Sequence, residues 1–127
     1  MNNVSVWLLE RLLNDNGQHH ATIRNYIPGE AIFRVGDAGD YLAVLLSGSV
    51  EIRKGAHLIS AIEPGSMFGE MGIIDRHPRI ADAIAKNNSR IAEIREGQFT
   101  SMLRETPEFG LAIMRILSDR LRKKIET

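Results

Sequence analysis

The chain has 127 residues, enough for one domain that buries roughly two-thirds of its extended surface. Apolar residues make up 43% and charged residues 25%, which is typical of a folded globular protein and excludes global disorder. Sixteen basic side chains balance sixteen acidic ones, and this balance argues against a nucleic-acid-binding surface. The sequence has no cysteine, no long apolar run and no signal-like start, so we expect a cytoplasmic domain that contacts no membrane.

The first 24 residues are expected to form an N-terminal helical segment. Trp7, Leu8 and Leu12 recur at a spacing of three to four residues, and the polar stretch NDNGQ follows them. This spacing gathers apolar side chains on one face of a helix, so it predicts a short helix that ends in the polar stretch.

Residues 25–96 are predicted to form β-structure. Eight of the eleven glycines fall between positions 29 and 72, where they mark turns. Strand-length segments rich in Val, Ile and Leu lie at 41–46, 49–54 and 57–62, and a later strand is expected at 90–94. Short strands that follow one another closely, separated by turns, predict a sandwich or a barrel.

Residues 97–127 are predicted to form two helices. The first is short and covers roughly residues 98–104, and the second begins at Pro107, whose fixed φ suits a first helical turn. Apolar residues then recur at helical spacing to the end of the chain: Leu111, Met114, Leu117, Leu121 and Ile125. Positions 111, 114, 118, 121 and 125 also form a seam, although position 118 is Ser. The seam leaves two alternatives open, packing on the chain's own domain or pairing with a second copy as a homodimer.

The stretch 64–85, PGSMFGEMGIIDRHPRIADAIA, combines the residue types of an anion site. If the apolar segment after Gly69 forms a helical turn, its first N–H groups lack internal partners and favour a phosphate. Arg79 can add two parallel charged hydrogen bonds to the same anion. A carboxylate repels phosphate, so the expected partner of Glu70 is a hydroxyl such as a ribose 2′-OH. Together these residues indicate a site for a nucleotide with a single negative charge.

Residue by residue, this stretch resembles the phosphate-binding cassette of the cyclic nucleotide-binding domain family, which includes the catabolite activator protein and the regulatory subunits of cyclic AMP-dependent protein kinase. The matching residues are Phe68-Gly69-Glu70 and Pro78-Arg79-Ile80-Ala81. Residues 24–52 resemble the opening strands of the family, and the segment from Phe99 resembles its hinge and long helix. The resemblance implies a mainly β fold, a jelly-roll-like β-roll with one helix before it and two after it.

The resemblance also implies how a ligand is held. In this family, Arg79 and nearby backbone amides would hold the cyclic phosphate, and Glu70 would hold the ribose hydroxyl. Ile59 and Ser60 align with residues that line the base in some members. The implied ligand-binding residues are Ile59, Ser60, Gly69, Glu70, Met71, Arg79, Ile80 and Ala81. The leading hypothesis is a sensor module that binds cyclic AMP, needs no other cofactor, and acts through an unidentified effector protein or a dimer interface.

Two residues depart from the family pattern. Ile80 stands where members that bind cyclic nucleotides usually carry Ser, Thr or Ala, and a lost hydroxyl costs about 1 kcal/mol of binding, which counts more against cyclic GMP than against cyclic AMP. Asp82 stands where Ser or Thr is usual, and it opposes a phosphate unless it faces away. The alternative hypothesis is therefore a β-roll interaction or dimerisation domain that has lost nucleotide binding, in which Glu70 and Arg79 form a structural ion pair.

No catalytic or metal-ligating residue is predicted, and we expect no enzyme. A cupin-like metalloenzyme would need an HxH motif, which His19, His20, His57 and His77 do not form. No serine lies beside an evident base. Only two residues follow Ile125, too few for a helix-turn-helix, so DNA binding by this chain alone is not expected.

Overall fold

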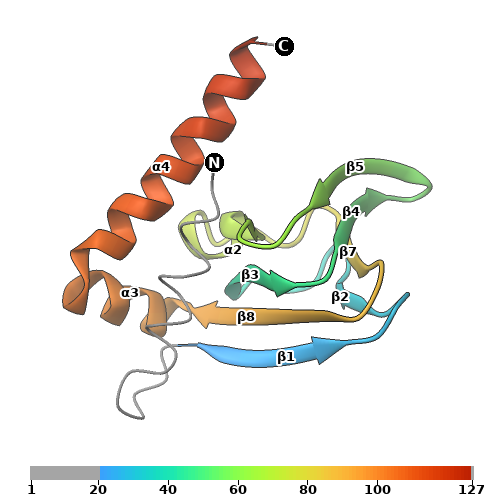
Figure 1. The fold of residues 1–127 in the computed structure, drawn as a ribbon, viewed down its shortest axis with the longest axis horizontal. Coiled ribbons are helices and arrows are strands. Elements are labelled where there is room, and N and C mark those ends of the chain that lie inside the picture. The colour runs from blue at the N-terminus through green and yellow to red at the C-terminus, as the bar shows by residue number, and fades with distance from the viewer. Residues whose placement is uncertain (1–20, 127) are drawn as a thin grey trace.

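The structure is a computed structural model that describes residues 21–126 (Figure 1). Within this range the chain forms eight strands and three helices: β1 (Thr22–Tyr26), β2 (Ala31–Phe33), β3 (Tyr41–Ser47), β4 (Val50–Lys54), β5 (His57–Ile62), β6 (Met67–Phe68), α2 (Glu70–Ile74), β7 (Asp82–Ala85), β8 (Ser89–Arg95), α3 (Glu96–Glu105) and α4 (Pro107–Glu126). The helix predicted before the β-roll lies outside the described residues. β1 begins at Thr22, three residues before the β-roll was expected to start.

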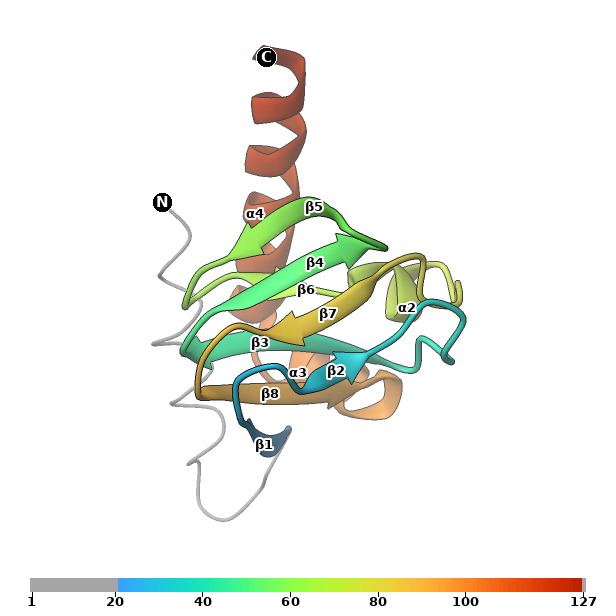
Figure 2. The same ribbon diagram turned by 90° about the vertical axis from the view of Figure 1, so that its right-hand side faces the viewer.

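The strands form two antiparallel sheets. One has the order β1-β8-β3-β6 and the other has the order β2-β7-β4-β5. Figure 2 views the β2-β7-β4-β5 sheet, with α4 behind the β-roll. Two sheets with flanking helices confirm the predicted mainly β, jelly-roll-like fold, and α3 and α4 are the two helices expected after it.

β3 explains why a continuous apolar run occurs in the middle of the chain. Leu42, Val44 and Leu46 belong to a core shared with α3 and α4. Ala43 and Leu45 belong to a second core that lies among the strands of both sheets. Successive side chains of a strand point to opposite faces, so a strand buried on both faces is apolar at every position.

The helical turn predicted after Gly69 is confirmed as α2, with Gly69 as its N-cap at φ +73°. Close backbone packing fixes this helix against the loop between β2 and β3. A Cβ at Gly72 would collide with the backbone of Gly39, so both positions need glycine for the two segments to touch. The contact holds α2 at one end of the β-roll.

α4 packs on the β-roll through a different face from the predicted seam. Phe109, Ile113 and Ile116 are buried against the domain, whereas the seam residues are exposed, by 60% at Met114 and 62% at Leu121. Of the two alternatives left open by the sequence, packing of the seam on its own domain is therefore wrong. α4 carries two apolar stripes, and spacing alone does not say which one meets the core. None of the described helices has the length and apolar content needed to cross a membrane.

Candidate functional site

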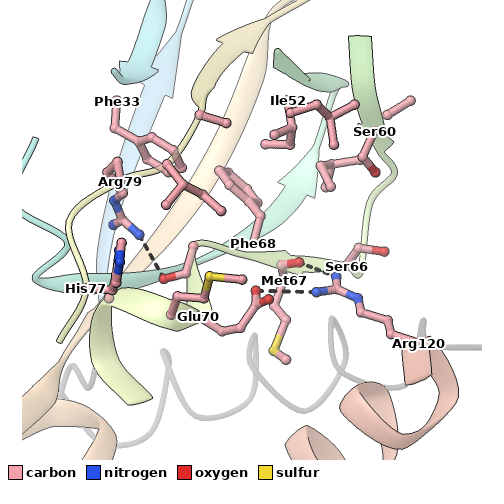
Figure 3. A pocket seen from close by; sticks show the side chains of 18 of the residues that line it. Phe33, Ile52, Ser60, Ser66, Met67, Phe68, Glu70, His77, Arg79 and Arg120 are labelled. Carbon is pink, nitrogen blue, oxygen red and sulfur yellow. Dashed lines mark hydrogen bonds and ion pairs between the residues drawn. The ribbon is translucent and has the colours of Figure 1, made fainter. Parts of the chain in front are cut away.

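A cavity of about 460 Å³ opens between β5, α2, the loop before β7 and α4 (Figure 3). Every residue that the sequence assigned to the site lines this one cavity: Ile59, Ser60, Gly69, Glu70, Met71, Arg79, Ile80 and Ala81. The fold brings them together because residues of β5, of α2 and of the loop before β7 line the same cavity. The described structure therefore places a guanidinium and a carboxylate at the wall of one pocket.

Arg79 is a buried cation, only 5% exposed. Its Nη1 donates to the Gly69 carbonyl oxygen at 2.8 Å, and its Nη2 donates to the Tyr41 carbonyl oxygen at 2.7 Å. Its Cζ lies 4.1 Å from the ring centre of Phe33 and 4.7 Å from that of Tyr41. Burial lowers the pKa of Arg79, because removal from water disfavours the charged form.

The Arg79 side chain still has unused capacity. Its Nε is buried and has no hydrogen-bond partner, and no carboxylate of residues 21–126 forms an ion pair with the guanidinium. A guanidinium carries five N–H donors, of which two are used by the carbonyl oxygens. Buried charges are costly unless they are paired, so this group favours an anion in the cavity beside it.

Glu70 is held from the opposite direction, by α4. Its Oε1 accepts a hydrogen bond from Arg120 Nη1 at 3.3 Å, and Arg120 Nη2 also donates to the Met67 carbonyl oxygen. Figure 3 shows Arg79 and Arg120 on opposite sides of the cavity, with Glu70 turned toward Arg120. Glu70 and Arg79 are not joined, so the alternative of a structural ion pair between these two residues is wrong.

The two departures from the family pattern have different places in the structure. Ile80 lines the cavity and is half-exposed. Asp82 does not line the cavity, because its Oδ1 accepts a hydrogen bond from the Val35 backbone N–H at 2.8 Å. The Asp82 carboxylate therefore caps the loop after β2 and does not face an anion in the pocket.

Sequence reasoning missed three residues that shape the site. Phe33 and Tyr41 contact the Arg79 side chain from β2 and β3, and Arg120 contacts Glu70 from α4. These contacts could not be predicted from local sequence patterns, because Tyr41 precedes Arg79 by 38 residues and Arg120 follows Glu70 by 50. Lys123, one turn further along α4 from Arg120, also lines the cavity.

The histidines gather no metal-binding group in the described part of the chain. His77 lines the cavity, but its Nδ1 lies 2.7 Å from the neighbouring Pro78 carbonyl oxygen. Residues 21–126 contain no cluster of three or more His, Asp or Glu that could hold a metal ion. His19 and His20 lie outside these residues.

Comparison with known proteins gives consistent matches to one family. The model of the cyclic nucleotide-binding domain matches residues 23–106. A CRP-like cAMP-activated global transcriptional regulator of Mycobacterium tuberculosis is 31% identical over 100 residues, which cover 75% of this chain and 45% of that protein. A cGMP-dependent protein kinase of Plasmodium berghei is 39% identical over 72 residues, 57% of this chain and 8% of the kinase.

The solved structures agree with this result. The catabolite activator protein of Thermus thermophilus superposes with a TM-score of 0.74 and 25% identity, over 89% of this chain and 59% of that one. The chain spans less than half of the length of the curated regulator from Mycobacterium tuberculosis. The matched segment contains the whole cassette from Phe68 to Ala81. The chain thus belongs to the cyclic nucleotide-binding domain family.

Proposed function

We propose that the cavity binds a cyclic mononucleotide, cyclic AMP above all, and that the chain is a regulatory module and not an enzyme. One observation carries this proposal: Arg79 is a buried cation at the cavity wall with an unpartnered Nε and no carboxylate partner among the described residues. A monoanionic phosphate would supply the missing charge and accept the unused N–H donors through charge-assisted hydrogen bonds.

The size and lining of the cavity support a mononucleotide. Its volume of about 460 Å³ lies within the range of small-molecule sites. Ile52, Ile59 and Ile80 supply apolar surface for a base, and Glu70 supplies an acceptor for a ribose hydroxyl. Ile80 offers no hydroxyl to a guanine, and this favours cyclic AMP over cyclic GMP. The similarity to a regulator named as cAMP-activated points the same way.

Arg120 gives the module a physical means to report occupancy. This residue ties α4 to the Glu70 carboxylate and to the Met67 carbonyl oxygen. A ribose 2′-OH that donates to Glu70 changes the acceptor available to Arg120, and the change passes to α4. We expect the module to act in the cytoplasm on an effector that remains to be identified.

Calorimetric titration with cyclic AMP and cyclic GMP tests the proposal. We expect micromolar or tighter binding of cyclic AMP and weaker binding of cyclic GMP. Arg79→Lys keeps the charge but loses the planar fork, and Glu70→Gln loses the charged acceptor, so each is expected to weaken binding by roughly tenfold to 100-fold. Arg76→Ala is the matched control, because Arg76 lies in the same loop, is exposed and does not line the cavity. Absence of binding to either nucleotide at millimolar concentration contradicts the proposal.

The exposed stripe of α4 supports a homodimer, and it is also the observation behind the second candidate function, an interaction domain that binds no nucleotide. The stripe consists of Leu111, Met114, Leu121 and Ile125. Sedimentation velocity should show a dimer that Met114→Ser and Leu121→Ser together convert to a monomer. Ile74→Ser is the control, since Ile74 is equally apolar and exposed but lies on α2. A wild-type chain that stays monomeric at high concentration contradicts the dimer.

A further inference from the structure

Tyr41 holds the side chain of Arg79 in two ways. Its backbone carbonyl oxygen accepts a hydrogen bond from Arg79 Nη2 at 2.7 Å, and its ring centre lies 4.7 Å from Arg79 Cζ. The ring is buried, and its hydroxyl makes only a long hydrogen bond of 3.4 Å to the Ile32 carbonyl oxygen. The face of the ring contacts Arg79 directly, whereas the hydroxyl adds an electrostatic interaction and donates its hydrogen bond to Ile32.

The same ring also faces a second cation, Arg95, whose Cζ lies 5.5 Å from the ring centre. Arg95 has carboxylate partners, since its Nη1 lies 2.9 Å from Asp40 Oδ2 and its Nη2 lies 3.6 Å from Glu93 Oε1. Arg79 has no such partner among residues 21–126. Of the two cations, it is Arg79 that is held by aromatic faces and carbonyl oxygens, while Asp37 and Asp40 favour its charge without forming an ion pair with it.

Tyr41 does not itself line the cavity, whereas Arg79 and Phe33 do. An effect of Tyr41 on a ligand must therefore pass through another residue. An arginine side chain has many rotamers. If the site already fixes one of them, ligand binding does not have to order the side chain, and less conformational entropy is lost on binding. The two carbonyl oxygens and the two rings fix the Arg79 guanidinium at the cavity wall while leaving its Nε–H unused.

We infer that Tyr41 is a positioning residue for anion binding, whose ring holds Arg79 in the orientation that receives the phosphate of the ligand. The inference rests on the proposed function, because it names the residue that prepares the phosphate end of that site. It assigns to Tyr41 a contribution to affinity without any contact with the ligand.

Substitutions at position 41 separate the ring from the rest of the side chain. Tyr41→Phe keeps the ring and should change the affinity for cyclic AMP by about twofold or less. Tyr41→Met has a similar size but no ring, and should weaken binding by roughly fivefold to tenfold. Tyr41→trifluorophenylalanine keeps the shape but withdraws electron density from the ring face, and should weaken binding by roughly threefold relative to Tyr41→Phe. This third variant keeps the test valid if Tyr41→Met fails to fold.

The matched control is Tyr26→Met, the same chemical change in β1, which β8 separates from β3 in the same sheet. The Tyr26 hydroxyl lies 3.4 Å from Glu93 Oε2, and within residues 21–126 the rings that contact Arg79 are those of Phe33 and Tyr41. This variant loses a half-buried tyrosine, so it reports what a purely structural loss does to binding. We expect its stability to fall and its affinity for cyclic AMP to stay within about twofold of wild type.

A second measurement needs no ligand. The ¹H–¹⁵N signal of Arg79 Nε, assigned by its loss in Arg79→Lys, should show the ring-current shift of a group beside aromatic faces. The shift should persist in Tyr41→Phe and decrease in Tyr41→Met. An unchanged shift in Tyr41→Met overturns the inference even if no nucleotide binds, which would separately contradict the proposed function. Cyclic AMP bound equally well, or more tightly, by Tyr41→Met and Tyr41→trifluorophenylalanine overturns the inference and leaves the proposed function standing.

Discussion

The two charged ends of the cavity are built in opposite ways. Arg79 is buried, and it is fixed by backbone oxygens and aromatic rings that belong to the β-roll. Glu70 is partly exposed, and it is held by Arg120, whose side chain is 34% exposed and comes from α4. One end is thus part of the core of the domain, and the other is shared with a helix that packs on it.

This difference assigns separate roles to the two ends. A buried cation without a carboxylate partner binds an anion strongly, because the cation has already lost its water during folding and binding adds no further desolvation of that group. A partly exposed ion pair contributes little to stability, so it can be rearranged by a ligand at low cost. The Arg79 end is suited to affinity, and the Glu70–Arg120 end is suited to transmitting occupancy to α4.

Gly69→Ala should have the largest effect, because it breaks the Arg79 end. A Cβ at Gly69 would collide with Arg79 Nη1, and φ of +73° is strained for any L side chain. We expect calorimetry to show a loss of cyclic AMP affinity of roughly 100-fold, the value of a charged hydrogen bond. Gly29→Ala is the matched control, since Gly29 has φ +86° but no atom within 4 Å of its would-be Cβ. It should lose about 1–2 kcal/mol of stability and no affinity. Equal affinities in the two variants would refute the assignment of Gly69.

Arg120→Ala should have an intermediate effect, confined to the Glu70 end. In wild type, a hydrogen bond to the Glu70 carboxylate should favour cyclic AMP over 2′-deoxy cyclic AMP by roughly tenfold or more. Without Arg120 the carboxylate is no longer oriented, and this preference should fall by roughly threefold while phosphate binding persists. Arg115→Ala, an exposed position on α4 outside the cavity, is the control. An unchanged preference in Arg120→Ala would show that Arg120 does not orient Glu70.

Ile80→Ser should have an effect of similar size, and it should weaken the preference for cyclic AMP over cyclic GMP. A hydroxyl at this cavity position gives a guanine or a phosphate oxygen one more partner, so cyclic GMP affinity should rise by roughly fivefold. Cyclic AMP affinity should change by about twofold or less, which competition titrations can resolve. Ile74→Ser is the control, because Ile74 is similarly exposed and lies outside the cavity. A decrease in cyclic GMP affinity in Ile80→Ser would contradict the interpretation of this position.

The smallest expected effect is a change in stability with pH, caused by the two tyrosines Tyr26 and Tyr41. Burial raises the pKa of Tyr26 from 10.0 to about 12, and burial also raises the pKa of Tyr41. The neutral phenol is favoured in the folded state, so its stabilisation is complete below pH 10 and is lost as the pH rises from 10 to 12. Because the chain has only two tyrosines, phenolate absorbance can follow both. Tyr26→Phe should reduce the alkaline loss of stability, and tyrosines that titrate near pH 10 in the folded chain would contradict the shift.

Local patterns were enough to predict most of the fold. Turn glycines and apolar runs located β3, β4 and β5 within one residue of their bounds, because their signals lie within a few neighbouring positions. For the outer stripe of α4, the sequence left open whether it packs on its own domain or pairs with a second copy, and the structure shows that it does not pack on its own domain. Helical spacing reports that Leu111 and Ile113 lie on apolar stripes, but only the tertiary structure shows that Ile113 is the buried one.

In the site too, residues of a local motif could be predicted from the sequence, whereas residues from distant segments could not. The eight predicted residues share a cavity because six of them belong to a cassette in one short stretch of sequence, and Ile59 and Ser60 lie on β5, the strand that precedes this stretch. The groups that fix Arg79 and Glu70 come from β2, β3 and α4, far away in sequence. Long-range contacts of this kind leave no spacing for a sequence pattern to report, so the aromatic support of Arg79 and the link from Arg120 to Glu70 emerge only from the fold.

A crystal structure of the chain grown with cyclic AMP tests the central claim most directly. The account predicts one nucleotide in the cavity, its phosphate within hydrogen-bond distance of the Arg79 guanidinium and its 2′-OH on Glu70, with Tyr41 still against Arg79. An empty cavity at saturating nucleotide, or a nucleotide whose phosphate lies away from Arg79, would contradict it.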